Sequence, residues 1–300
     1  MTILVMGAGA VGSWFGGLLA RAGHEVALVA RPAHVEAIRR GGLRLESQAF
    51  DERVRVAAHE GVAAVRGADL VLLCVKATDT EAAAASLAPT LADGATVLSL
   101  QNGVDNAERA QRVLGRPVTP AVVYVAVELA GPGHVRHHGR GELVMPDDGA
   151  CARIAPLLRA AGIPVHPSAD ILGALWAKLI VNCACNPLSA IARLPFGPLL
   201  QGAGVADVMR DVVAECQAVA RVAGIVVPGD PEEALRRTGS QSGQYASMAQ
   251  DLMHGRRTEI DHLNGHVVRL GSRLGVPTPV NRTLHALVSL LEAQAGNAAG

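Results

Sequence analysis

The chain has 300 residues, half of them apolar, and its 27 basic and 27 acidic side chains give a formal net charge of zero. That balance argues against a nucleic-acid-binding protein, which normally carries a basic face. No run of about 18 uncharged apolar residues predicts a membrane span, and a glycine loop at residue 7 replaces the pattern of a signal peptide. We therefore expect a cytoplasmic protein of one large or two smaller domains.

The first thirty residues predict strand, glycine loop, helix and strand in succession. Thr2–Met6 is a short apolar strand, the loop follows it, a helix runs to about Ala22, and Glu25–Ala30 is the next strand. This order is the opening βαβ unit of a doubly wound sheet. The apolar run Leu70–Val75 predicts a buried parallel strand. Further elements are a hairpin of Leu43–Leu45 with Val54–Val56, helices at Thr80–Leu91 and Asn106–Leu114, and strands at Thr96–Leu100, Val118–Leu129 and Glu142–Met145.

The pattern changes near residue 167. The segment His166–Asp170 has the composition of a linker that ends in helix-capping residues, and no strand pattern follows it. The predicted helices are Ile171–Ala192, Val205–Ala223, Glu232–Thr238, Tyr245–His254, Glu259–Leu274 and Val280–Ala295. The sequence thus predicts an α/β fold, with a Rossmann-type doubly wound sheet in residues 1–167 and an all-α C-terminal domain in residues 168–300.

The loop Gly7-Ala8-Gly9-Ala10-Val11-Gly12 predicts a dinucleotide-binding site. Its glycine spacing is meaningful because it follows a strand and opens a helix, whose N-terminal N–H groups and dipole favour phosphate. The second strand ends at Arg31, where an NAD site usually has an acidic residue, and no carboxylate follows before Glu36. A guanidinium can bind a 2′-phosphate, so we expect NADP(H) as the cofactor.

Only two of the 27 basic residues are lysines, Lys76 and Lys178. Arginine does not release its proton in proteins, whereas lysine can, so two lysines in apolar surroundings indicate a functional role. The alternative is that these two positions remained lysine by chance.

Lys178, Asn182 and Asn186 are spaced by four in an otherwise apolar helix. That spacing places them along one side, where polar groups need either a hydrogen-bonding network or a wet cleft. A structural polar seam between helices is the alternative.

No metal site is expected. Five scattered cysteines in a cytosolic chain are typical of reduced, buried thiols, and His134, His137 and His138 fit a polar hairpin.

Taken together, these motifs resemble the ketopantoate reductase (2-dehydropantoate 2-reductase) family. They are the glycine loop, Arg31, Lys76, Gln101-Asn102-Gly103, the segment Leu175–Leu188, Ser247-Met248 and the segment Thr258–Gly265. They occur in order over nearly the whole chain. The resemblance implies an NADPH-dependent reductase of the pantothenate pathway, and it marks Lys178 with its two asparagines and the Thr-Glu-Ile-Asp segment as the specific parts.

The resemblance also implies residue roles. Lys178 would act as general acid toward the substrate carbonyl, and Glu259 would pair with it or position it. Asn102 would orient the nicotinamide or the substrate, and Lys76 would contact the cofactor or a substrate oxygen. The substrate's hydroxyl and carboxylate would be held by Asn182, Asn186 and Ser247.

Three positions depart from the family pattern, which often has His at Gln101, commonly has Asn at Gln244 and usually has a polar side chain at Phe196. These departures concern the outer contacts of the substrate more than the catalytic set. Two alternatives therefore stay open: a related reductase of another 2-keto acid or carbonyl compound, and a non-catalytic NADP-binding sensor. A small-molecule substrate is the expected partner, and the apolar C-terminal helices are compatible with a homodimer.

Overall fold

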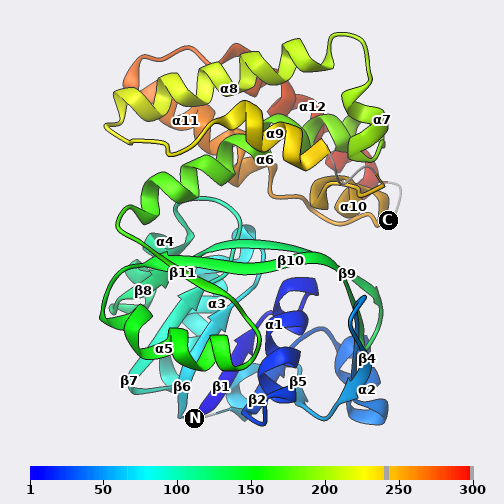
Figure 1. The fold of residues 1–300 in the computed structure, drawn as a ribbon, viewed down its shortest axis with the longest axis vertical. Coiled ribbons are helices and arrows are strands. Elements are labelled where there is room, and N and C mark those ends of the chain that lie inside the picture. The colour runs from blue at the N-terminus through cyan, green and yellow to red at the C-terminus, as the bar shows by residue number, and fades with distance from the viewer. Residues whose placement is uncertain (66, 240–242, 298–300) are drawn as a thin grey trace. The chain divides into compact units, whose positions relative to one another are not determined.

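The computed structural model describes the chain except residues 66, 240–242 and 298–300. It divides into two compact units, Met1–Ile171 and Leu172–Gly300 (Figure 1). The division falls slightly after the expected boundary at residue 167, because residues 165–168 form a strand of the first unit.

A six-stranded parallel sheet forms the centre of the N-terminal unit. Its strand order is β5-β2-β1-β6-β7-β8, which corresponds to the order 3-2-1-4-5-6 of dinucleotide-binding folds. The strands are β1 (Thr2–Met6), β2 (Glu25–Val29), β5 (Ala57–His59), β6 (Ala68–Leu73), β7 (Leu91–Ser99) and β8 (Val118–Pro120). The chain order reverses between β1 and β6, and ligands bind beyond the carboxyl ends of the strands at such a point. The predicted α/β fold with a parallel sheet is therefore confirmed.

Both faces of this sheet are covered, as the uninterrupted apolar strands predict. Alternate residues such as Val5, Leu28 and Leu72 pack toward α1 (Ala10–Arg21). Their neighbours, such as Leu4 and Leu73, pack toward α3 (Thr80–Leu87) and α4 (Asn106–Leu114). Helices therefore cover both faces of the parallel sheet.

A second, mixed sheet lies on the other side of α1 from the parallel sheet (Figure 1). It contains β3 (Leu43–Glu46), β4 (Asp51–Val54), β9 (Val122–Gly131), β10 (His134–Pro146) and β11 (Val165–Ser168). The remaining helices of the unit are α2 (Pro32–Gly41) and α5 (Gly149–Ala160), with short 3-10 turns at Val62–Ala64, Ala77–Asp79 and Ala88–Thr90. Buried residues of α1, including Trp14 and Phe15, belong to the same core cluster as Leu43 and Val135 of this sheet.

Several local predictions were wrong. The segment predicted as a linker at His166 is β11, which pairs in parallel with β10. The predicted hairpin exists, but β3 also pairs with β10, and the second strand ends at Val54. The chain then forms β5, which pairs with β2. Three helices, α2, α5 and α7, were not predicted.

The described part of the C-terminal unit is helical, as predicted. Its helices are α6 (Ile171–Ala192), α7 (Phe196–Leu200), α8 (Val205–Val222), α9 (Pro231–Gly239), α10 (Ser247–Met253), α11 (Asn264–Leu274) and α12 (Pro279–Asn297). The predicted helix Glu259–Leu274 is interrupted, because a 3-10 turn at Ile260–His262 precedes α11.

By length and composition α6 could cross a membrane, which the sequence analysis did not anticipate. However, 56% of its most apolar 18-residue window is buried inside the structure, as in the core helix of a globular domain. Length and hydropathy are therefore weak evidence for a membrane span here.

Candidate functional site

Two glycines of the loop between β1 and α1 are required by the fold itself. Gly7 has φ +96°, and a Cβ there would lie 2.6 Å from the backbone nitrogen of Val75. A Cβ on Gly12 would lie 2.4 Å from the Gly7 carbonyl oxygen and 2.9 Å from the side chain of Val5. Gly7 thus permits the tight turn, and Gly12 permits α1 to approach β1.

Gly9 has no such requirement. Its φ of −73° is open to any residue, and no atom lies within 4 Å of the place that its Cβ would occupy. Gly9 precedes α1, whose first-turn N–H groups lack intrahelical acceptors, as in every α-helix. Open space beside these donors is what a pyrophosphate needs, so the loop fits a dinucleotide.

Arg31 is the candidate residue for the ribose of such a dinucleotide. It follows β2 directly, is exposed and forms the N-cap of α2. The nearest following carboxylate, Glu36, lies on α2, is largely exposed and has Arg40 as its ion-pair partner at 4.0 Å. The end of β2 therefore offers a guanidinium for the ribose, and the sequence has no carboxylate between it and Glu36.

Lys76 and Asn102 lie at the same edge of the parallel sheet. Strands β6 and β7 pair side by side with Leu73 opposite Ser99, and each candidate residue follows its strand by three positions. Lys76 is the N-cap of the 3-10 turn Ala77–Asp79. The carbonyl of Asn102 accepts a hydrogen bond of 2.6 Å from the side chain of Asn106.

A buried polar network joins the loops that carry these two residues. The side-chain amide nitrogen of Gln101 donates to the Val75 carbonyl, directly before Lys76, over 3.0 Å and to the Thr80 hydroxyl over 2.8 Å. Its amide oxygen accepts from Ser99 at 3.0 Å. From the sequence alone, Gln101 is only a departure from the family pattern. Its place directly after a strand, between apolar Leu100 and Asn102, was the signal for a structural role.

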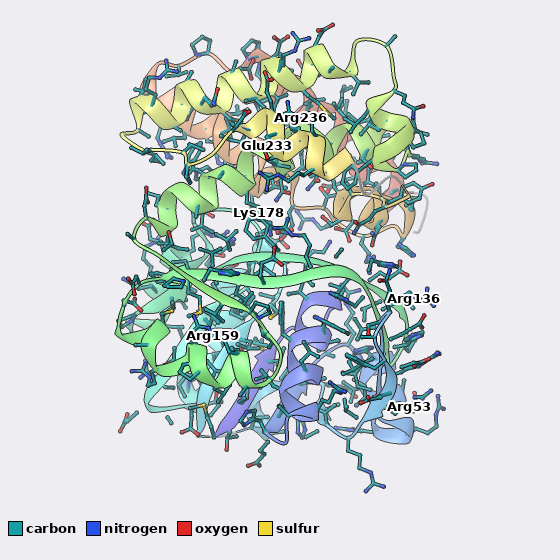
Figure 2. All side chains as sticks on the ribbon, in the orientation of Figure 1. Arg53, Arg136, Arg159, Lys178, Glu233 and Arg236 are labelled. Carbon is teal, nitrogen blue, oxygen red and sulfur yellow. The ribbon has the colours of Figure 1, made fainter. Side chains whose placement is uncertain are left out.

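In the C-terminal unit, α6 carries the predicted polar side. Lys178, labelled in Figure 2, and Asn182 are partly exposed, whereas Asn186 is buried. The apolar residues around them, such as Leu179, Ile180 and Cys183, are buried in this unit. The spacing of four therefore places one ammonium and two amides along a single helix, which continues through Pro187.

Glu259 lies in a segment that is tied to α6 and α12. Thr258 donates its backbone N–H to Glu292 of α12 over 2.5 Å. Asn264, at the start of α11, donates to the Cys183 carbonyl of α6 and to the side chain of Asn281, both over 3.0 Å. Asn264 was not among the predicted site residues, and its bond to the Cys183 carbonyl fixes the segment after Glu259 against α6.

Ser189 of α6 fixes the segments that carry Phe196 and Ser247. Its hydroxyl donates to the Leu194 carbonyl over 2.7 Å and accepts from the Ala246 backbone N–H at 3.4 Å. The Phe196 N–H also donates to the Gln244 carbonyl over 2.9 Å, so two positions that depart from the family pattern are direct neighbours. Phe196 is buried, and Ser247 is exposed at the first position of α10.

No group of three or more His, Cys, Asp or Glu side chains that could hold a metal occurs among residues 1–65, 67–239 and 243–297. All five cysteines are free. Strand β10 carries the three histidines of the predicted hairpin, His134, His137 and His138. His134 contacts Glu46 at 2.6 Å, and His138 contacts Glu128 at 3.3 Å. Burial raises the pKa of the Cys185 thiol to about 12, so this thiol stays protonated at neutral pH.

The predicted site residues therefore form two sets. The N-terminal unit holds the glycine loop, Arg31, Lys76 and Asn102 around the carboxyl ends of β1, β2, β6 and β7. The C-terminal unit holds Lys178, Asn182, Asn186, Ser247 and Glu259. The first set fits a dinucleotide, and the second offers a proton donor with amide, hydroxyl and carboxylate groups.

Comparison with known proteins gives matches along nearly the whole chain. The family model described as ketopantoate reductase PanE/ApbA matches residues 3–149, and the model of the C-terminal part of the same family matches residues 170–292. The curated 2-dehydropantoate 2-reductase of Pyrococcus horikoshii is 34% identical over 99% of both chains.

Solved structures agree with these matches. A PanE/ApbA family ketopantoate reductase from Ralstonia eutropha superposes with a TM-score of 0.95 at 57% identity, covering 99% of this chain and 100% of the other. D-mandelate dehydrogenase, solved with NADH and anilino(oxo)acetate, superposes with a TM-score of 0.92 at 27% identity with the same coverage. From its two family-model matches and its full-length similarity to a curated relative, the chain belongs to the ketopantoate reductase family and is an oxidoreductase.

Proposed function

We propose that the chain catalyses the NADPH-dependent reduction of 2-dehydropantoate to pantoate. The observation that carries the proposal is the intact Lys178, Asn182 and Asn186 set on α6, in a chain that is 34% identical to a curated 2-dehydropantoate 2-reductase. Reduction of a 2-keto acid needs a hydride at the ketone carbon and a proton at the ketone oxygen. A dinucleotide in the glycine loop supplies the hydride when it is bound.

Lys178 is the proposed general acid. Its ammonium polarises the ketone of the substrate and then gives a proton to the oxygen as negative charge develops there. Glu259 is proposed to position this ammonium, and its segment is suited to that role because Thr258 and Asn264 tie it to α12 and α6. Fixed placement matters because a small displacement of the donor costs rate.

The remaining polar groups are proposed to orient the two reactants. Asn182, Asn186 and Ser247 offer amide and hydroxyl groups for the carboxylate and hydroxyl of the keto acid. Lys76 and Asn102 follow neighbouring strands of the dinucleotide-binding sheet and are proposed to contact the cofactor, and Asn102 also the substrate. The Gln101 network supports both loops.

NADPH is proposed over NADH because of Arg31. The end of β2 carries an exposed guanidinium, and no acidic residue lies between it and Glu36 to accept from a ribose 2′-hydroxyl. A guanidinium forms charge-assisted hydrogen bonds with a 2′-phosphate, which NADH lacks.

A second candidate is a reductase of another 2-keto acid. The D-mandelate dehydrogenase structure shares the fold over 99% of this chain, so this fold also serves a different acid in another protein. Phe196 is buried and lies beside Gln244. This favours a substrate site whose outer wall is less polar than in the family pattern. Under this candidate, the enzyme favours a keto acid with an apolar side chain.

One experiment tests the two candidates. Initial rates are measured with 2-dehydropantoate, 2-ketoisovalerate and phenylglyoxylate, each with NADPH and with NADH. The proposal expects the highest kcat/KM for 2-dehydropantoate with NADPH. A much higher kcat/KM for phenylglyoxylate would favour the second candidate, and a preference for NADH would refute the cofactor assignment.

We further propose that the enzyme works in the cytoplasm, where its five free thiols would remain reduced. A homodimer remains a prediction, supported by the exposed Leu287 and Leu290 on α12. Light scattering on the purified protein measures its mass in solution.

A further inference from the structure

His34 is a buried histidine that belongs to neither set of candidate site residues. It lies in the first turn of α2, three residues after Arg31, and its backbone N–H donates to the Arg31 carbonyl over 3.0 Å. Only 7% of the residue is exposed. Buried polar rings are normally hydrogen-bonded, and the partners of this ring connect α2 to the glycine loop.

The partners of the ring determine its tautomer. Nδ1 lies 2.9 Å from the backbone nitrogen of Gly133, and a backbone N–H can only donate. Nδ1 is therefore the acceptor, so the proton of the neutral imidazole is on Nε2. Burial lowers the pKa of His34, which favours this neutral form.

The same reasoning gives the direction of the next hydrogen bond. Nε2 lies 3.0 Å from the hydroxyl oxygen of Ser13, so the ring donates and Ser13 accepts. The single hydroxyl proton of Ser13 is then available for the Ala8 carbonyl oxygen, 3.1 Å away. The donor and the acceptor are thus determined for every hydrogen bond from Gly133 through His34 and Ser13 to Ala8.

This chain of hydrogen bonds ends in the loop that fits the dinucleotide. The N–H of Ala8 donates to the Val29 carbonyl at the end of β2 over 2.8 Å, so both peptide groups of Ala8 are held. Its carbonyl belongs to the peptide that leads into Gly9, the open position of the loop. The Gly9 N–H already donates to the Gly7 carbonyl over 2.8 Å, so the orientation of this peptide fixes where the first turn of α1 presents its free N–H groups.

We propose that His34, held as its Nε2–H tautomer, is a positioning residue for the dinucleotide, because through Ser13 it fixes the Ala8 carbonyl and so sets the glycine loop relative to Arg31 at the start of α2. The proposal rests on the proposed function, since it assumes that a dinucleotide binds this loop. His34 does not touch the ligand in this assignment, and its effect passes through backbone that does.

The other end of the chain of hydrogen bonds is equally fixed. Gly133, in the turn between β9 and β10, has φ +71°, and its carbonyl accepts from the Arg44 N–H over 2.8 Å. A Cβ on Gly133 would lie 3.0 Å from the Cβ of Ala37 on α2. The turn is therefore packed against α2, and its N–H holds the His34 ring in one orientation.

Two conservative substitutions test the roles of Nδ1 and Nε2 of His34 separately. His34→Gln carries an amide N–H at about the reach of Nε2, so it can still donate to Ser13. His34→Asn offers an acceptor at about the position of Nδ1 for Gly133 and does not reach Ser13. Ser13→Ala removes the hydroxyl that joins the ring to Ala8. His24→Gln is the matched control, because His24 precedes β2 at the opposite end of that strand.

The measurement is the Kd for NADPH and for NADH by fluorescence titration, with melting temperatures recorded in parallel. We expect His34→Asn and Ser13→Ala to raise both Kd values on the order of tenfold, because loss of a buried hydrogen bond displaces the loop that both cofactors share. The ratio of the two Kd values stays at that of the wild type. His34→Gln and His24→Gln stay close to the wild type.

Three results would overturn the proposal. The first is wild-type cofactor affinity in both His34→Asn and Ser13→Ala. The second is equal weakening by His34→Asn and His34→Gln in step with their melting temperatures, which indicates a merely structural role. The third is no dinucleotide binding by the wild type, and only that result also refutes the proposed function.

A second measurement does not depend on whether the variants fold. In wild-type protein labelled with ¹⁵N at histidine, the ring resonances of His34 are assigned directly. The proposal expects an unprotonated Nδ1 and a protonated Nε2 at neutral pH. The opposite tautomer would reverse the hydrogen bonds and overturn the assignment.

Discussion

The side-chain amide of Gln101 donates to the hydroxyl of Thr80 over 2.8 Å, and this contact joins the loops after two neighbouring strands. Both residues are buried. The same amide nitrogen donates to the Val75 carbonyl. The Thr80 hydroxyl donates to Oδ1 of Asn106 over 3.2 Å, and Nδ2 of Asn106 donates to the Asn102 carbonyl. Lys76 and Asn102 are therefore carried by one connected polar network.

Gln101→Ala should lower stability and weaken cofactor binding together. The substitution leaves the Val75 carbonyl and the Ser99 and Thr80 hydroxyls without this partner in a buried place, which costs about 1–3 kcal/mol. We expect a lower melting temperature and a higher KM for NADPH. Gln201→Ala, at an exposed position, is the control, and an unchanged KM for NADPH in Gln101→Ala would contradict the role of the network.

Lys178→Ala should lose most turnover while still binding NADPH. Removal of a general acid costs roughly 100- to 10,000-fold in rate, whereas the glycine loop belongs to the other unit and is left intact. Single-turnover rates and fluorescence titration measure the two effects. Lys178→Arg should also be slow, because arginine keeps the charge and does not release a proton. Near-normal kcat in Lys178→Ala across the pH range would rule out the proposed general acid.

Arg31→Ala should weaken NADPH binding much more than NADH binding. Only NADPH carries the 2′-phosphate, and a charge-assisted hydrogen bond to it is worth about 1.5–3 kcal/mol. Arg40→Ala removes a largely exposed guanidinium from the same helix and serves as the control. Equal losses for both cofactors in Arg31→Ala would show that Arg31 does not read the phosphate. This result also differs from that of Ser13→Ala, which should leave the ratio of the two Kd values unchanged.

Acidification should destabilise the wild type relative to His34→Gln. Burial holds the folded pKa of His34 below its usual value of 6.5, and its two ring partners, a hydroxyl and a backbone N–H, carry no charge. As pH falls below about 6.5, the unfolded chain takes up the proton first, so the free energy of unfolding decreases until the folded pKa is reached. Above pH 7 this contribution is complete.

Denaturant unfolding of the wild type and His34→Gln at several pH values between 5 and 8 measures the difference. Subtracting the two free energies of unfolding at each pH removes the contribution of the titratable groups that both proteins share. A difference that does not change with pH would show that His34 titrates alike in the folded and unfolded chains.

The substrate prediction concerns the hydroxyl of ketopantoate. If a buried group hydrogen-bonds this hydroxyl, a keto acid without it loses a factor of about 10⁴ in kcat/KM. With Phe196 and Gln244 at the outer positions, we expect a smaller loss and measurable turnover of 2-ketoisovalerate. Phe196→Ser should raise the preference for ketopantoate over 2-ketoisovalerate, and a preference that does not change would place the hydroxyl elsewhere.

Strong local signals in the sequence predict the first elements of the fold. Thr2–Met6, the glycine loop, α1 and β2 follow from an apolar run, three glycines and a second apolar run, and the structure has them at the predicted places. The spacing of Lys178, Asn182 and Asn186 fixed their common side of α6, because helical geometry depends on nothing beyond the helix. The roles of these residues remain predictions.

Elements and contacts that depend on distant partners could not be predicted in this way. Ala57–His59 is a strand because β2 lies beside it, and Val165–Ser168 is a strand because β10 does, since neither segment has an apolar run of its own. Gln101, His34 and Asn264 acquired their roles in the same way, through partners 21 to 99 residues away along the chain. A side chain's hydrogen-bond partner is set by which backbone the fold brings to it, and no local pattern encodes that.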